Sequence, residues 1–284
     1  MSVPELCGGL GNQLFQVCSV YGLSLKTGND FAIDPRYINS NCYKHSKEKY
    51  IESIFNKFTI CNVNITGVVH ENMIHDYLTR TLTSAPLRTK PMPPATKACG
   101  TLFKGYYQDP SFFDHQKTKV LSMLNWESAK NSIVKYDVEN SIFIHFRLGD
   151  FLHPDTAWLH NIVTPKYYEE ALSHFDTNTS GIGGTASCGT GLLVFSNEPD
   201  NVVSRFPFLT KYNYTIVREN EMDSMYIMSR CRLGGICANS TFSWWGAYLN
   251  DSPVKKIVMP SRFYKSDSIP QSAYYFKDVI KIEV

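Results

Sequence analysis

Four segments of this chain each run directly into a cluster of polar residues. Three of the segments are apolar or glycine-rich runs typical of buried strands in a parallel sheet, and the first is the short strand expected at the start of the chain. In such sheets, ligands bind at the carboxyl ends of the strands. In chain order the polar positions are Asn12 after the first strand, Arg147 to Asp150 after residues 141–146, Ser196 and Asn197 after residues 192–195, and Asn239 to Ser243 after residues 235–238.

Segments with helical periodicity separate these strands. Apolar residues recur at spacings of three and four over residues 12–26, and further helices are predicted over residues 111–131 and 220–232. The alternation of strands and helices predicts an α/β architecture with parallel sheets. We expect two domains, residues 1–130 and residues 131–284.

Composition excludes several classes of partner. The chain has 284 residues, 43% of them hydrophobic, which is enough for a substantial core. Lysine and arginine number 28 against 26 acidic residues, so the overall charge gives no reason to expect a nucleic acid or a membrane surface. No stretch approaches the roughly 20 apolar residues of a membrane helix, and we expect a soluble protein.

The eight cysteines lack the paired spacing of a zinc site or a small disulfide scaffold. Reduced thiols in the cytoplasm are the simplest interpretation. In an oxidising compartment, Cys42 with Cys61 and Cys231 with Cys237 would be the candidate bridges.

Arg147 is a permanently charged residue placed directly after an apolar strand. Its planar guanidinium can grip a diphosphate with two hydrogen bonds. His145 and Asp150 flank it and are candidate general bases, although each also fits a role in supporting the loop. An ion pair between Arg147 and Asp150 that merely finishes the strand is the equally simple alternative.

The segment Asn239, Ser240, Thr241, Phe242 and Ser243 offers an amide, hydroxyls and successive backbone N–H groups before an apolar run. If a helix begins near Ser243, its amino end forms an anion cradle. An ordinary helix cap explains the same residues.

Other motifs are weak or missing. The loop Gly8 to Asn12 precedes a helix but completes neither a P-loop nor a GxGxxG pattern. The sequence has no Asp-x-Asp triplet, the usual acidic site through which a transferase holds a metal-bound sugar nucleotide. The histidines near His145 lack a ligand pattern, so no metal site is predicted.

Three segments in order resemble the alpha-1,2-fucosyltransferases of glycosyltransferase family 11. Gly105-Tyr106-Tyr107-Gln108 and Phe195-Ser196-Asn197 are weaker matches. The resemblance spans residues 8–249, and the ordered set is specific. The three segments are Gly8-Gly9-Leu10-Gly11-Asn12-Gln13-Leu14-Phe15-Gln16, His145-Phe146-Arg147-Leu148-Gly149-Asp150, and Ala238-Asn239-Ser240-Thr241-Phe242-Ser243-Trp244-Trp245-Gly246-Ala247.

The resemblance implies a type B glycosyltransferase fold, in which two Rossmann-like domains face each other across a cleft. It implies an acceptor on the side of the first domain and GDP-fucose held mainly by the second. The implied reaction moves fucose to the 2-hydroxyl of a terminal beta-galactoside, with inversion and without a metal or other cofactor. Arg147 would bind the diphosphate. The donor-site residues carried over by position are Gly11, Asn12, Arg147, Ser196, Asn197 and Asn239 to Ser243.

The sequence departs from the family at Leu148, where a second arginine is usual, and one charge contact of the family is thereby in question. Three alternatives stay open: the same chemistry with another sugar nucleotide or acceptor, a catalytically silent nucleotide- or glycan-binding module, and a phosphate-ester hydrolase. The last is disfavoured because no nucleophile and metal set is visible. Since the glycine-rich loop begins at residue 8, the resemblance implies a bacterial or viral type in the cytoplasm, or a trimmed Golgi enzyme.

Overall fold

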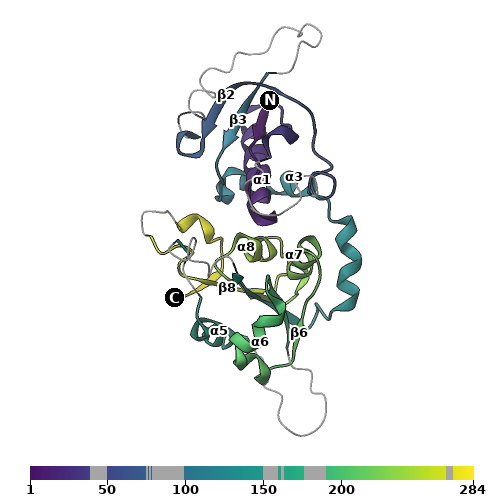
Figure 1. The fold of residues 1–284 in the computed structure, drawn as a ribbon, viewed down its shortest axis with the longest axis vertical. Coiled ribbons are helices and arrows are strands. Elements are labelled where there is room, and N and C mark those ends of the chain that lie inside the picture. Colours follow the sequence, from purple (N-terminus) through teal and green to yellow (C-terminus); the bar gives the residue numbers. More distant parts are fainter. Residues whose placement is uncertain are drawn as a thin grey trace. The chain divides into compact units, whose positions relative to one another are not determined.

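A computed structural model gives the fold as two compact units, Met1–Asn125 (unit 1) and Trp126–Val284 (unit 2). Each unit contains a parallel sheet with helices, which confirms the predicted α/β class (Figure 1). The structure describes residues 1–38, 50–74, 76, 78, 99–149, 159–160, 163–175, 190–266 and 271–284.

Unit 1 is built on the parallel strands β1 (Ser2–Pro4), β3 (Cys99–Lys104) and β2 (Asn64–His70), paired in that order. Helix α1 (Leu10–Thr27) follows β1, as the periodicity predicts. It is buried almost all round along its first four turns rather than on one face, because β1 packs against one side and residues 110–122 pack against another. Burial on several sides weakens the amphipathic signal of such a helix.

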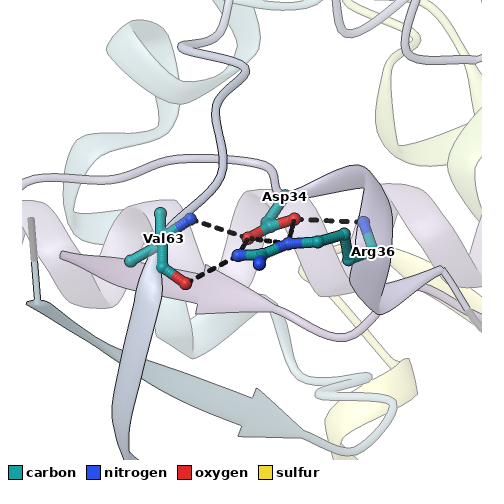
Figure 2. Close-up of polar contacts among 3 residues, drawn as sticks. All are labelled: Asp34, Arg36 and Val63. Atoms are coloured by element: carbon teal, nitrogen blue, oxygen red, sulfur yellow. Dashed lines mark hydrogen bonds and ion pairs between the residues drawn. The ribbon is translucent and has the colours of Figure 1, made fainter. Parts of the chain in front are cut away.

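A buried carboxylate ties two segments of unit 1 together (Figure 2). Asp34 accepts hydrogen bonds from the backbone N–H of Val63 at 2.8 Å and from the guanidinium of Arg36 at 2.6 Å. Arg36 also donates to the carbonyl of Val63 at 2.8 Å. Burial opposes ionisation of Asp34, but these hydrogen bonds outweigh it and hold the pKa of the carboxyl below its usual value. The cluster fixes the chain entering β2 against residues 34–36.

The helix predicted over residues 111–131 is interrupted. The backbone N–H of Asn125 donates to the carbonyl of Ile54 at 2.9 Å, so a tertiary contact replaces the bond that would continue a helix. The segment instead forms four short elements: 3₁₀ turns at Pro110–Phe112 and Asp114–Gln116, helix α3 (Lys117–Ser122), and the 3₁₀ helix Glu127–Lys135.

Unit 2 contains a doubly wound sheet. Its strands are β4 (Ser141–Phe146), β5 (Gly191–Ser196), β6 (Tyr214–Ile216), β7 (Gly234–Ile236), β8 (Lys256–Pro260) and β9 (Val279–Ile282). All pair in parallel in the spatial order β6-β5-β4-β7-β8-β9. Counted from β4, this is the order 3-2-1-4-5-6 of a Rossmann sheet, whose topological switch point lies between β4 and β7.

Helices cover both faces of this sheet (Figure 1). On one face lie α5 (Pro165–Leu172) and α6 (Val202–Arg205), which share a core with alternate residues of β4. On the other face lie α7 (Glu221–Arg230) and α8 (Thr241–Tyr248). Both tryptophans of α8 are fully buried, so they belong to the core.

Two thiols named as a candidate bridge are not joined. Cys231 and Cys237 are both free and fully buried, and burial raises the pKa of each well above the usual range. Cys42, of the other candidate pair, lies outside the described residues. None of the helices within the described residues has the length and apolar character needed to cross a bilayer.

Candidate active site

The switch point of unit 2 brings two of the predicted polar clusters together. Arg147 directly follows β4, whereas Asn239 and Ser240 follow β7 and lead into α8. The ring centroids of His145 and Phe242 lie 5.5 Å apart, so the end of β4 contacts the first turn of α8. Ligands of doubly wound sheets bind at this position, outside the carboxyl ends of the strands.

Alternation along β4 decides which side chains face α8. Phe146 and Leu148 point into the core shared with α5 and α6, where Leu148 is only 5% exposed. Successive side chains of a strand point to opposite faces, so His145 and Arg147 lie on the other side. Arg147 is partly exposed. A second arginine at position 148 would enter the core, which explains why leucine suits this chain.

His145 is a buried, neutral imidazole. Its side chain is 2% exposed, and its Nδ1 atom has no hydrogen-bond partner within the part of the chain that the structure describes. Burial lowers the pKa of His145 to about 3, and the positive charge of Arg147 acts in the same direction. At neutral pH this side chain is therefore uncharged and a weak base, better suited to hydrogen bonding than to proton abstraction.

Asn197 holds the loop that carries the arginine. Its Oδ1 accepts from the N–H of Leu148 at 2.8 Å and its Nδ2 donates to the Leu148 carbonyl at 3.2 Å, as a neighbouring strand would. Gly149 has a φ of 57°, and a Cβ there would lie 2.6 Å from Asn197 Nδ2. Ser196 accepts at Oγ from the N–H of Glu198 at 3.0 Å. The structure therefore gives both predicted residues, Ser196 and Asn197, contacts that shape this edge of the sheet.

Two neighbouring tyrosines of α5 fix the strand ends from the opposite face. The hydroxyl of Tyr168 donates to the carbonyl of His145 at 2.9 Å, and that of Tyr167 donates to the carbonyl of Cys237 at 2.7 Å. Both rings are buried. Helical periodicity can predict such burial, but it contains no signal that the two hydroxyls reach carbonyls on either side of the switch point.

Two of the predicted donor-site residues use their side chains within the protein. Asn239 donates from Nδ2 to the carbonyl of Phe263 at 3.0 Å. Ser243 is fully buried, and its hydroxyl donates to the carbonyls of Ala238 and Ser240, each at 3.4 Å. These contacts hold the turn between β7 and α8 together.

The helix itself begins at Thr241 rather than near Ser243. Ser240 is the N-cap, and its Oγ accepts from the N–H of Phe242 at 3.3 Å. Thr241 and Phe242 are partly exposed at the positive end of α8. Arg147 and the amino end of α8 thus follow the two strands that flank one switch point, β4 and β7, an arrangement suited to a diphosphate.

Asp150, the third residue proposed to act in catalysis, lies outside the described residues. The alternative in which Asp150 forms an ion pair with Arg147 therefore also involves a residue that the structure does not describe. Among the residues that the structure describes, no three His, Cys, Asp or Glu side chains gather closely enough to hold a metal ion.

The two remaining predicted residues belong to unit 1. Gly11 is buried in the first turn of α1, whereas Asn12 is partly exposed and accepts at Oδ1 from Nε2 of Gln108 at 2.9 Å. The buried amide of Gln16 donates to the carbonyl of Gly105 at 3.3 Å. The glycine-rich loop and the segment Gly105–Gln108 therefore form one connected structure, although the sequence separates them widely.

Comparison with known proteins gives one family. The family model described as Glycosyl transferase family 11 matches residues 10–282. O-antigen biosynthesis glycosyltransferase WbnK of Escherichia coli is 26% identical over 300 residues, covering 93% of this chain and 95% of that protein. An alpha-1,2-colitosyltransferase of Escherichia coli is 22% identical over 288 residues, covering 94% of this chain and 93% of that protein.

A third relative is the putative galactoside 2-alpha-L-fucosyltransferase svh-11 of Caenorhabditis elegans, 23% identical over 282 residues, covering 93% of this chain and 71% of that protein. The parallel sheets of the two units agree with the predicted type B glycosyltransferase fold. Because the family model spans nearly the whole sequence, the chain belongs to glycosyl transferase family 11.

Proposed function

We propose that this protein transfers fucose from GDP-fucose to the 2-hydroxyl of a terminal beta-galactoside, with inversion and without a metal ion. The position of Arg147 carries the proposal, since this partly exposed residue directly follows β4, at the switch point of a Rossmann sheet, and the end of β4 contacts α8. The names of two relatives, an alpha-1,2-colitosyltransferase and a putative galactoside 2-alpha-L-fucosyltransferase, support the linkage.

In the proposed reaction the acceptor oxygen forms a bond to the anomeric carbon of fucose while the bond from that carbon to the diphosphate oxygen breaks. The acceptor hydroxyl loses its proton, and negative charge grows on the departing GDP. Arg147 and the amino end of α8 stabilise that charge, as a metal ion does in other transferases. His145 supplies a neutral hydrogen-bonding group beside Arg147. Because His145 is uncharged, it does not compete with the diphosphate for the positive charge of Arg147.

The donor site of this proposal comprises the residues carried over from the family. Ser240 and Phe242 present the amino end of α8, whereas Asn239, Ser243 and Asn197 hold the two loops in place. Gly11 and Asn12 contribute from unit 1. Of the two candidate bases, His145 is disfavoured by its low pKa, so Asp150 is the one that we propose from unit 2.

The direct test is incubation with GDP-fucose and a panel of beta-galactosides, followed by mass spectrometry and linkage analysis of the product. The proposal predicts a single added fucose on the 2-hydroxyl of galactose. A product fucosylated on N-acetylglucosamine or on a protein hydroxyl would contradict the acceptor. GDP binding without turnover would instead identify a silent binding module.

A second donor is favoured by one comparison, because a relative that aligns with 94% of this chain is named a colitosyltransferase. Colitose is fucose without its 3-hydroxyl group, so both sugars present the same anomeric chemistry. Discrimination would rest on whether the protein hydrogen-bonds that hydroxyl, since a site built to bind a hydroxyl rejects the analogue that lacks it. Competition between GDP-fucose and GDP-colitose, read as the ratio of kcat/KM, decides between them.

We also propose that the protein works in the cytoplasm, with the lumen of the Golgi as the alternative for a trimmed form. The free thiols of Cys231 and Cys237 agree with this placement. Fractionation of cells that produce the protein, with detection by antibody, tests it, and recovery from a secretory compartment would contradict it.

A further inference from the structure

Two neighbouring tyrosines after β3 have opposite environments. Tyr107 is fully buried, and its hydroxyl donates to the carbonyls of Val69 at 3.3 Å and Lys104 at 3.4 Å. Its own carbonyl accepts from the hydroxyl of Ser19 at 2.9 Å. Tyr106, in contrast, is 46% exposed. The buried ring anchors the segment, and the preceding residue, Tyr106, lies at the surface of unit 1.

The backbone on both sides of Tyr106 is in the left-handed region. Gly105 has a φ of 152° and Tyr107 a φ of 50°. A bulky residue in this region costs on the order of 1–3 kcal/mol, and such residues cluster at functional sites. A Cβ at Gly105 would lie 2.6 Å from Cβ of Glu71, so the glycine allows Glu71 to pack against the turn. The turn that contains Tyr106 is therefore followed by one strained residue, Tyr107.

Polar groups surround the displayed ring. Glu71, which follows β2, accepts at Oε2 from the N–H of Tyr106 at 2.9 Å. Its other oxygen, Oε1, accepts no hydrogen bond within the described residues. Two residues after Tyr106, Gln108 donates to Asn12 of the glycine-rich loop. An aromatic face, a carboxylate oxygen with spare capacity and two linked amides therefore stand at the carboxyl ends of the strands of unit 1.

We propose that this cluster is the acceptor subsite, in which the pyranose ring of the terminal sugar stacks on Tyr106 and Glu71 accepts one of its hydroxyls. The inference rests on the proposed function, because it names where that function's acceptor binds. Galactose has an axial 4-hydroxyl, which leaves adjacent C–H groups on one face of the ring. An exposed aromatic face complements that surface, and the polar groups at its edge fix the orientation.

Direct binding measures this subsite without turnover. Titration of the protein with lactose and other beta-galactosides, followed by saturation-transfer NMR, gives a Kd for each variant in the presence of GDP. Tyr106→Leu keeps an apolar side chain but removes the aromatic face, and it should raise the Kd roughly ten-fold or more. Tyr106→Phe keeps the face and should bind nearly as the wild type does. Glu71→Gln should weaken binding while a thermal melt shows the unit still folded.

The matched control is Val68→Ala, which alters another side chain of unit 1 that is 46% exposed. This variant should change neither the Kd for galactosides nor the Kd for GDP. The affinity for GDP should be the same in all variants, because none of the changed residues, Tyr106, Glu71 and Val68, belongs to the proposed donor site. Wild-type galactoside affinity in a folded Tyr106→Leu protein overturns the inference, as does a wild type that binds no galactoside of the panel. Wild-type protein that binds galactosides through Tyr106 but transfers no fucose contradicts only the proposed function.

Discussion

The hydroxyl of Tyr168 donates a hydrogen bond to the backbone carbonyl of His145 over 2.9 Å, and both residues are buried. Removing a buried donor leaves the acceptor unsatisfied, which costs about 1–3 kcal/mol. Tyr168→Phe should therefore lower the free energy of unfolding of unit 2 by about that amount, measured by urea titration of the whole protein. Tyr212→Phe is the control, because Tyr212 is only partly buried and its hydroxyl makes no hydrogen bond to the part of the chain that the structure describes. Equal stability of the two variants would show that the Tyr168 bond contributes nothing.

Leu148→Arg restores the residue that the family usually has. Because Leu148 is 5% exposed in an apolar core, the guanidinium would be buried without a partner. We expect a loss of about 3 kcal/mol or more in unfolding free energy and no gain in turnover. Thermal melts beside donor-saturated rates measure both. A variant that is as stable as the wild type and faster would mean that the loop can turn this side chain towards the donor.

Asp34→Asn should destabilise unit 1 in a pH-dependent way. The folded pKa of Asp34 is below its unfolded value of about 3.9, so its stabilising contribution is present above that value and is lost as the pH falls through the folded pKa. At pH 7 the variant should lose roughly 2 kcal/mol relative to the wild type. The difference should shrink below about pH 4.

Hydrogen exchange of unit 1 amides over this pH range measures the effect of Asp34→Asn. The exposed Asp30→Asn serves as the control for removal of one negative charge. A stability difference that does not change with pH would show that the Asp34 charge is not the stabilising feature.

The strands and the polar residues that follow them could be predicted because both depend on local sequence. The run at residues 141–146 is mostly apolar and becomes the buried strand β4, and the Asn220 N-cap precedes α7 where periodicity starts. The break near Asn125 was not predictable, because it depends on a bond to Ile54, some seventy residues earlier. Local patterns contain no information about such distant partners.

The candidate site shows the same limit. The position of Arg147 after β4 could be read from the sequence, whereas the environment of its neighbours could not. Burial is the main cause of the low pKa of His145, and one of the rings packed against His145 belongs to Phe242, which is nearly a hundred residues away. Strand alternation likewise shows that the side chain of Leu148 points into the core, but only once it is known that the sheet face covered by α5 forms that core.

Transfer should survive removal of metal ions. A fixed guanidinium and the amino end of α8 take the role of the cation in the proposed reaction. Transfer rates measured in excess EDTA should equal those in buffer treated with a chelating resin. Added manganese should change neither of these two rates. Loss of transfer in EDTA that manganese restores would show that this charge scheme is wrong.

Arg147→Ala should lose turnover rather than only affinity for the donor. Charge on the diphosphate grows as fucose leaves, so a bond from Arg147 strengthens in the transition state and its removal lowers kcat. Arg147→Lys keeps the charge but loses the planar fork that donates two bonds, and it should be nearly as impaired. Loss of one transition-state donor lowers the rate by roughly 10²-fold.

The most direct test of the account is the rate of fucose transfer by folded Arg147→Ala at saturating GDP-fucose, with a thermal melt of the same sample. The account predicts a melting temperature close to that of the wild type and a kcat lower by roughly 10²-fold or more. If the folded variant turns over at nearly the wild-type rate, Arg147 has no part in the mechanism.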